Sequence, residues 1–357
     1  MKRFRVAIDT TPLESGHRVR GMGSYVKQLA QALERDSRIT VHPVELRHGA
    51  GRILITEYDL LHIPYFDLFF PTLKIPSEVP TVVTVPDVIP LLYPKHYPPG
   101  VRGRINFTRQ KRELQKASAI ITISETSKKD IIRFLGIPQE KIFVTHLAPG
   151  NEQSSVISHS PRFGEAGQSS VIGKLPRKFV LYIGDVNYNK NILRLAEACK
   201  KIKIPLVIVG KQAASKDYDR GHPENRELRE LQDKYGEDKD VIRLGFLEEE
   251  DFATVWKKAS VYCQPSLYEG FGLPVVEAFA AKVPVVCAKT QALAEVAGDA
   301  ACYFDPYCVD DMAGKLKGVI ENRKLQRDLR GKSAMRIKKF SWKKTARATI
   351  RVYEKIS

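Results

Sequence analysis

The chain has 357 residues, of which 43% are hydrophobic and 28% charged, and its formal net charge at pH 7 is +17. This length predicts two domains, and this composition excludes an intrinsically disordered chain. The positive charge favours an anionic partner such as nucleic acid, an anionic lipid surface or a phosphate-bearing substrate. The five cysteines form no CxxC pair, which argues against a zinc or disulfide framework and predicts a cytoplasmic protein.

Short β-rich runs alternate with amphipathic stretches through the first half of the chain. The expected strands are 4–9, 39–46, 58–63, 80–85 and 119–124, and the expected helices begin near Gly23, Val101 and Glu125. This alternation predicts a parallel sheet that is covered by helices on both faces.

The alternation stops in a stretch rich in Ser and Gly, and then it resumes. Further strands are expected at 178–184, 205–210, 241–246, 260–265 and 283–288, with helices between them. We therefore predict an α/β fold with two Rossmann-like doubly wound domains facing an interdomain cleft. The predicted boundaries are 1–170 for the first domain, with a linker at about 150–176, then 177–335 for the second and 336–357 for a terminal helix. No apolar run reaches the roughly 18 residues needed to cross a bilayer.

The string PSLYEGFGLPVVEA, residues 265–278, carries the clearest chemical signal. It predicts a loop that leaves a buried strand, followed by a helix that starts near Pro274. Glycines at such a helix start let backbone N–H groups approach a phosphate. Glu269 on the loop and Glu277 in the first helical turn can accept hydrogen bonds from sugar hydroxyls. The combination predicts a site for a nucleotide sugar. The alternative is that Glu277 only complements the helix dipole and Glu269 is solvated.

This string, extended through AFAAKVPVV, resembles the signature of retaining glycosyltransferases with the GT-B fold, in glycosyltransferase family 4, group 1. The segments RGMGSYVKQL, YIGDVNYNKN, LVIVG, RLGFLEEEDFATVWKKASVYCQPS and FSWKKTARATIRVYEKI resemble further parts of that family, in the same order. The first two segments are most similar to those of mannosyltransferases.

The resemblance implies roles for individual residues. Glu277 would bind the donor ribose, Glu269 the transferred sugar, and Lys190 the phosphates. The other donor-binding positions that the resemblance implies are Gly21, Gly23, Gly184, Asn191, Gly210, Lys211, Phe246, Leu247, Gly270, Phe271, Gly272 and Leu273. No metal or other cofactor is implied, and the transfer would retain the anomeric configuration.

The sequence departs from the family at two places. An Arg is often found near Asp185 or Asn189, and Lys211 or Arg18 is a candidate replacement as the second phosphate-binding cation. A common His-Asp pair reads Pro86-Asp87 here, which leaves Asp87 as a candidate catalytic residue or as the cap of the next turn.

Two further features have a functional and a structural interpretation. His62 is a candidate catalytic residue, and the alternative is a hydrogen-bonded core histidine. The helix expected at 101–117 carries a basic stripe of Arg102, Arg109, Arg112 and Lys116. This stripe predicts peripheral contact with the inner face of an anionic membrane, and the alternative is a solvated helix face.

The predicted function is transfer of a hexose from a nucleotide sugar to a glycan or lipid-linked saccharide. GDP-mannose is favoured as the donor, with a UDP-sugar as the alternative. Two other functions are a GT-B-fold sugar-nucleotide isomerase or phosphorylase, and a non-catalytic basic protein that binds polyanions. The last would require aromatic residues interleaved with the basic ones, a pattern that the sequence lacks.

Overall fold

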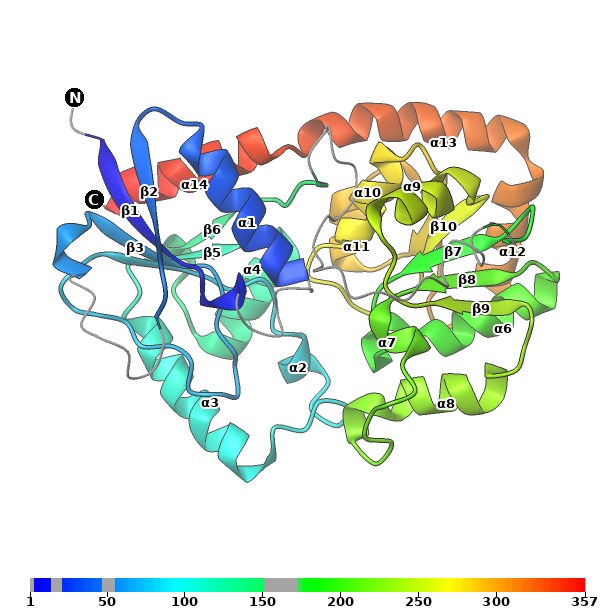
Figure 1. The fold of residues 1–357 in the computed structure, drawn as a ribbon, viewed down its shortest axis with the longest axis horizontal. Coiled ribbons are helices and arrows are strands. Elements are labelled where there is room, and N and C mark those ends of the chain that lie inside the picture. Colours follow the sequence, from blue (N-terminus) through cyan, green and yellow to red (C-terminus); the bar gives the residue numbers. More distant parts are fainter. Residues whose placement is uncertain (1–2, 14–20, 47–54, 151–172, 174, 357) are drawn as a thin grey trace. The chain divides into compact units, whose positions relative to one another are not determined.

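The computed structural model describes residues 3–13, 21–46, 55–150, 173 and 175–356 (Figure 1). The chain divides into two compact units. The first unit is Met1–Ala148 together with Phe340–Ser357, and the second is Pro149–Lys339. Each unit contains a six-stranded sheet in which the paired strands run parallel.

The sheet of the first unit has the strand order β2-β1-β3-β4-β5-β6. Its strands are β1 (Phe4–Asp9), β2 (Ile39–Val44), β3 (Leu60–Ile63), β4 (Thr81–Thr84), β5 (Ala119–Thr122) and β6 (Ile142–Val144). Every residue of β3, β4 and β5 is buried, because helices cover both faces of a doubly wound sheet.

The helices of the first unit include the last one of the chain. They are η1 (Thr11–Leu13), α1 (Gly21–Glu34), η3 (Ile55–Glu57), α2 (Ile89–Leu92), α3 (Gly100–Gln115), α4 (Glu125–Asp130), η4 (Ile131–Leu135), η5 (Gln139–Lys141) and α14 (Trp342–Ile356). Helix α14 packs beside α1, where the rings of Trp342 and Tyr25 have centroids 6.3 Å apart. The hydroxyl of Ser341 accepts a hydrogen bond from the amide of Lys344, which caps the start of α14.

The sheet of the second unit has the strand order β12-β11-β10-β7-β8-β9. Its strands are β7 (Val180–Ile183), β8 (Leu206–Val209), β9 (Val241–Leu244), β10 (Val261–Gln264), β11 (Val285–Ala288) and β12 (Ala301–Phe304). The chain winds outward from β7 in one direction and from β10 in the other. The two loops that follow β7 and β10 therefore diverge at a topological switch point, where doubly wound folds bind their ligands.

The second unit surrounds its sheet with helices of very different length. They are η6 (Tyr188–Lys190), α6 (Ile192–Ile202), α7 (Lys211–Ala214), η7 (Pro223–Asn225), α8 (Arg226–Tyr235), α9 (Glu249–Lys258), α10 (Leu273–Ala280), α11 (Gln291–Ala297), α12 (Val309–Glu321), α13 (Arg323–Arg336) and η8 (Ile337–Lys339). The core beneath them is apolar, and its largest side chain is the buried Trp256.

The prediction of an α/β fold with two doubly wound parallel sheets is confirmed. The edge strands β6 and β12 were not among the expected strands, because β6 has only three residues and only the first and last residues of β12 are buried. Across the described part of the chain, no helix combines the length and the apolarity that crossing a bilayer requires.

Candidate active site

The loops after β7 and β10 are joined by the polar segment Asn189–Asn191. The backbone carbonyl of Asn189 accepts a hydrogen bond from the amide of Leu267 (2.7 Å), and its side-chain amide donates to the carbonyl of Tyr268 (3.1 Å). The side-chain amide of Asn191 donates to the carbonyls of Pro265 (3.0 Å) and Pro306 (2.8 Å). Both asparagine side chains therefore hold the loop in place, which gives Asn191 a structural role that the resemblance did not imply.

Lys190 and Glu269 form an ion pair between these two loops. Lys190 Nζ lies 2.7 Å from Glu269 Oε1 and 3.0 Å from Oε2. Glu269 is buried, and its Oε1 also accepts hydrogen bonds from the side chains of Gln264 (2.9 Å) and Ser266 (2.7 Å). The sequence interpretation missed Gln264, although a glutamine that ends the apolar run VYCQ was a usable signal.

Helix α10 begins where the loop after β10 ends. Gly272 at its N-cap has φ +92°, and a Cβ there would lie 2.5 Å from Leu293 Cδ2, so only glycine fits. Pro274 lies in the first turn, as expected. The loop ends with Gly270 and the buried Phe271, and the helix begins at Leu273.

Glu277 lies in α10 with only 5% of its surface exposed. The prediction that it occupies the first turn is wrong, because α10 starts at Leu273 and its first turn holds no acidic residue. Within the described residues, its carboxylate has no hydrogen bond or ion pair. Burial raises the pKa of Glu277 to about 7.

The unpaired carboxylate of Glu277 should cost stability when it is ionised. Its pKa is about 7 in the folded protein against an ordinary value of 4.5, so the folded state binds the proton more tightly than the unfolded chain. The penalty is absent below pH 4.5, grows as the pH rises and is complete above pH 7 at up to about 3 kcal/mol. We expect Glu277→Gln to raise the melting temperature at pH 8 but not at pH 4.5.

The matched control for this prediction is Glu237→Gln, which removes an exposed glutamate from the same unit. Its effect on stability should stay within about 0.5 kcal/mol. If Glu277→Gln gave the same small change at both pH values, Glu277 would carry no buried charge.

Other predicted donor-binding residues lie at the carboxyl ends of β7, β8 and β9. Gly184 has φ +144°, and a Cβ on Gly210 would lie 2.3 Å from the carbonyl oxygen of Gly184, so the two turns pack closely. Lys211 begins α7 and is exposed, Phe246 is half-buried and Leu247 is buried. The structure thus brings these residues to the edge of the sheet that carries Lys190 and Glu269.

The glycines predicted near the donor in the first unit lie at the start of α1. Helix α1 begins at Gly21, and Gly23 follows within its first turn. Arg18, a candidate phosphate-binding cation, lies outside the described residues. Their role in donor binding therefore stays a prediction.

The structure favours the second interpretation of His62, that of a hydrogen-bonded core histidine. The ring is fully buried within β3, and its Nδ1 and Nε2 lie 2.7 Å from the Tyr353 hydroxyl and 2.8 Å from the Thr84 hydroxyl. Burial lowers its pKa to about 3, so the ring stays neutral. His62 is a core histidine that connects β3, β4 and α14.

The contacts of Asp87 fit the alternative interpretation, in which it caps the turn that follows. Its carboxylate accepts a hydrogen bond from the amide of Ile89 (3.1 Å), at the start of α2. This contact is that of a residue that caps the next turn. A catalytic role for Asp87 stays a prediction.

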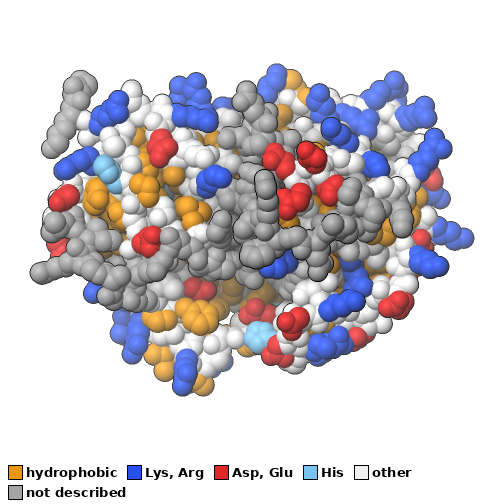
Figure 2. Space-filling model, in the orientation of Figure 1, with side chains coloured by type: hydrophobic (Ala, Val, Ile, Leu, Met, Phe, Trp, Pro, Cys, Tyr) orange, Lys and Arg blue, Asp and Glu red, His pale blue; other side chains and the backbone are white. Residues whose placement is uncertain are grey.

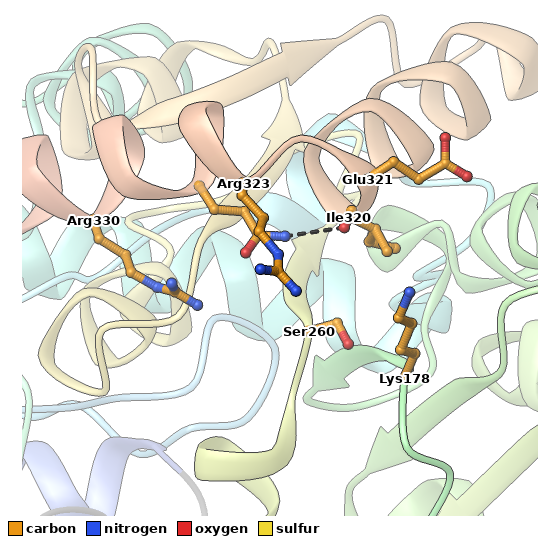
Figure 3. Close-up of a pocket in the computed structure, with 7 residues that line it drawn as sticks. Lys178, Ser260, Ile320, Glu321, Arg323 and Arg330 are labelled. Carbon is orange, nitrogen blue, oxygen red and sulfur yellow. Dashed lines mark hydrogen bonds between the residues drawn. The ribbon is translucent and has the colours of Figure 1, made fainter.

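A pocket of about 380 Å³ in the second unit lies away from these residues. Figure 3 shows Lys178, Arg323 and Arg330 around it, together with Ser260 and Glu321. Lys178 precedes β7 and Ser260 precedes β10, so the pocket lies at the amino ends of these strands. It is thus at the opposite edge of the sheet from Lys190 and Glu269. Among the described residues, no three His, Cys, Asp or Glu side chains come together as metal ligands.

Comparisons with known proteins agree with this arrangement. Residues 42–148 match the family Glycosyltransferase Family 4, and residues 169–335 match Glycosyl transferases group 1. The O-antigen chain mannosyltransferase B of Escherichia coli is 28% identical over 99% of this chain and 93% of that protein. The serotype-specific mannosyltransferase WbdA of Escherichia coli is 28% identical over 78% of this chain, which spans only 34% of WbdA.

Solved structures show the same fold. Sucrose-phosphate synthase from Thermosynechococcus elongatus superimposes with a TM-score of 0.70 at 19% identity, covering 99% of both chains. WaaG, a glycosyltransferase involved in lipopolysaccharide biosynthesis, gives a TM-score of 0.66 at 14% identity over 97% of this chain and 99% of WaaG. The chain therefore belongs to the group 1 glycosyltransferases of family 4, and it is a hexosyltransferase with the GT-B fold.

Proposed function

We propose that this enzyme transfers a hexose from a nucleoside-diphosphate sugar to a glycan or lipid-linked saccharide, with retention of the anomeric configuration. The proposal rests on one observation. Lys190, Glu269 and the start of α10 all lie at the switch point between β7 and β10. The similarity to proteins named as mannosyltransferases favours GDP-mannose over a UDP-sugar as the donor.

Each part of this site suits one part of such a donor. Glu277 has a buried carboxylate without a partner among the described residues, which suits it to accept hydrogen bonds from ribose hydroxyls. The backbone amides at the start of α10 and the Lys190 ammonium suit the diphosphate. Glu269 on the loop beside them suits the hydroxyls of the transferred sugar.

The proposed reaction exchanges one bond at the anomeric carbon for another. The bond from this carbon to the phosphate oxygen breaks, and the nucleoside diphosphate leaves with the electron pair. The acceptor hydroxyl bonds to the same face of the carbon, and its proton passes to the departing phosphate. Lys190 and the helix amides stabilise the negative charge that develops on the diphosphate, without a metal ion.

A thermal-shift panel of UDP, GDP and ADP with their sugars tests the donor. A ligand that binds only the folded state raises the melting temperature, so one nucleotide should give a clear shift, expected to be GDP. Glu277→Ala should weaken that shift. A flat panel would contradict the proposal. Release of the nucleotide only when an acceptor is added distinguishes transfer from isomerisation.

We also propose that the exposed face of α3 contacts an anionic membrane, which fits a lipid-linked acceptor. Val101 is 78% exposed, and Ile105 and the nearby Phe70 are exposed as well. Arg102 and Arg109 lie on the same side of α3 and form no ion pair among the described residues. Figure 2 shows hydrophobic and basic side chains together over α3. Apolar side chains beside unpaired cations are typical of surfaces that contact anionic lipid.

Vesicle sedimentation tests this contact. The protein should bind vesicles that contain phosphatidylglycerol and should not bind vesicles of pure phosphatidylcholine. High salt should release the bound protein, because it screens the attraction between charges. Val101→Asp with Ile105→Asp should weaken binding by roughly tenfold or more. Met335→Asp is the matched control, because Met335 is 65% exposed beside Lys332 and Lys339. Equal loss in both variants would contradict the assignment of α3.

A further inference from the structure

We infer that Gln264 is a positioning residue that holds Oε1 of Glu269, so that Oε2 is the oxygen presented to the donor sugar. This inference rests on the proposed function and assigns a task to each oxygen of one carboxylate. It also assigns supporting tasks to Ser266 and Tyr262, which contact Gln264.

The two oxygens of Glu269 have different partners. Oε1 accepts three hydrogen bonds, from Lys190 Nζ (2.7 Å), Gln264 Nε2 (2.9 Å) and Ser266 Oγ (2.7 Å). Among the described residues, Oε2 accepts only from Lys190 Nζ, at 3.0 Å. A carboxylate oxygen offers about two lone-pair positions, so Oε1 is fully used by the protein and Oε2 is not.

The hydrogen-bond directions around Gln264 are fixed by its neighbours. The Tyr262 hydroxyl donates to Gln264 Oε1, so the amide nitrogen of Gln264 must point the other way. That nitrogen donates to Ser266 Oγ (2.8 Å) and to Glu269 Oε1, and Ser266 in turn donates to the same oxygen. Tyr262, Gln264 and Ser266 are all buried, so water does not compete for these bonds.

An anionic diphosphate would compete with Glu269 for the N–H donors of the Lys190 ammonium. When an anionic phosphate draws Lys190 Nζ away, Oε2 loses its described partner and becomes free to accept from a sugar hydroxyl. Oε1 stays held by Gln264 and Ser266, so the carboxylate keeps its orientation during the exchange. Gln264 thus matters for the step in which the sugar is held, and much less for binding of the nucleotide.

The sharpest test is Gln264→Glu, which keeps the shape of the side chain. Two carboxyl groups in contact do not both ionise readily, so one of them has a raised pKa. The protonated acid at position 264 can donate to Oε1 as glutamine does, whereas the ionised form repels Glu269. We expect kcat of the variant relative to wild type to rise as the pH falls, and a ratio independent of pH would overturn the inference.

Gln264→Leu supplies the second measurement. The loss of a hydrogen bond to a charged group should lower kcat on the order of 10- to 100-fold, with the Kd for the nucleoside diphosphate unchanged within about twofold. Gln110→Leu is the matched control, since Gln110 is a buried glutamine of the first unit that bonds Leu73 and Asp67. The control should lose stability without lowering kcat of the folded fraction.

The two proposals fail in different ways. If wild-type protein transferred sugar but Gln264→Leu had the kcat of wild type, the positioning role would be wrong and the proposed function would stand. If wild-type protein bound no nucleotide sugar, the proposed function itself would be wrong.

Discussion

Glu269→Ala should lower turnover by on the order of 100-fold or more, while the nucleoside diphosphate still binds. Glu269 is placed to hold hydroxyls of the transferred sugar, so its removal should raise the barrier of the transfer step. The fold should persist, because the loop stays attached through Asn189 and Asn191. Steady-state kinetics with the donor found in the thermal-shift panel, together with a melting curve, measure both effects.

The control for this prediction is Glu230→Ala on α8. Glu230 also forms an ion pair, with Arg226 at 2.8 Å, but it lies on the exposed side of a helix. Its removal should leave kcat unchanged. Turnover by Glu269→Ala at the wild-type rate would remove Glu269 from the site.

Lys190→Met should lower both nucleotide affinity and turnover, the latter on the order of 100- to 1,000-fold. The ammonium is proposed to bind the diphosphate in the ground state and to stabilise the charge that develops as it leaves. The prediction therefore differs from that for Glu269→Ala, which should spare nucleotide binding. Calorimetric titration with the nucleoside diphosphate separates the two variants.

Lys200→Met is the matched control for Lys190→Met. Lys200 is a lysine of the same unit that pairs with Asp238 and Asp240 at the surface. Loss of such an exposed pair should change stability by less than about 1 kcal/mol and leave activity intact. Wild-type nucleotide affinity in Lys190→Met would contradict the role of the ammonium.

The buried carboxylate of Glu277 lowers the stability of the folded protein, and the same carboxylate is proposed to bind the donor. This carboxylate has no partner in the part of the chain that the structure describes. Ionisation of this group raises the free energy of the folded state above pH 7, and a well-packed apolar residue would avoid that cost. Such a cost is typical of a group that is retained for a ligand. Donor hydroxyls would supply the missing hydrogen bonds, so donor binding should be favoured once Glu277 is ionised.

The sequence was sufficient for most of the central, fully buried strands. β3, β5 and β7 are buried at every position, and their largely apolar sequences predict buried strands. β12 was missed, because its middle residues Cys302 and Tyr303 are only partly buried. Edge strands carry a weaker pattern, since one side of each pairs with no other strand.

Some features of the candidate site could likewise be predicted from the sequence, and others could not. The string around Glu269 and Glu277 predicted the loop, the helix and the glycine at the N-cap, because each depends on local backbone geometry. The core position of His62 could not be predicted from the local sequence. It depends on Tyr353, which is distant in the sequence and packs on His62 from α14. The bonds of Gln264 and Asn191 also depend on side chains brought together only by the fold, which no local pattern reveals.

The most direct test of the central claim is a crystal structure of the protein soaked with the nucleotide sugar that responds in the thermal-shift panel. We predict a diphosphate that contacts Lys190 and the first amides of α10, with the ribose on Glu277 and the sugar on Oε2 of Glu269. A donor bound instead in the pocket of Lys178, Arg323 and Arg330, or no donor between β7 and β10, would contradict the account.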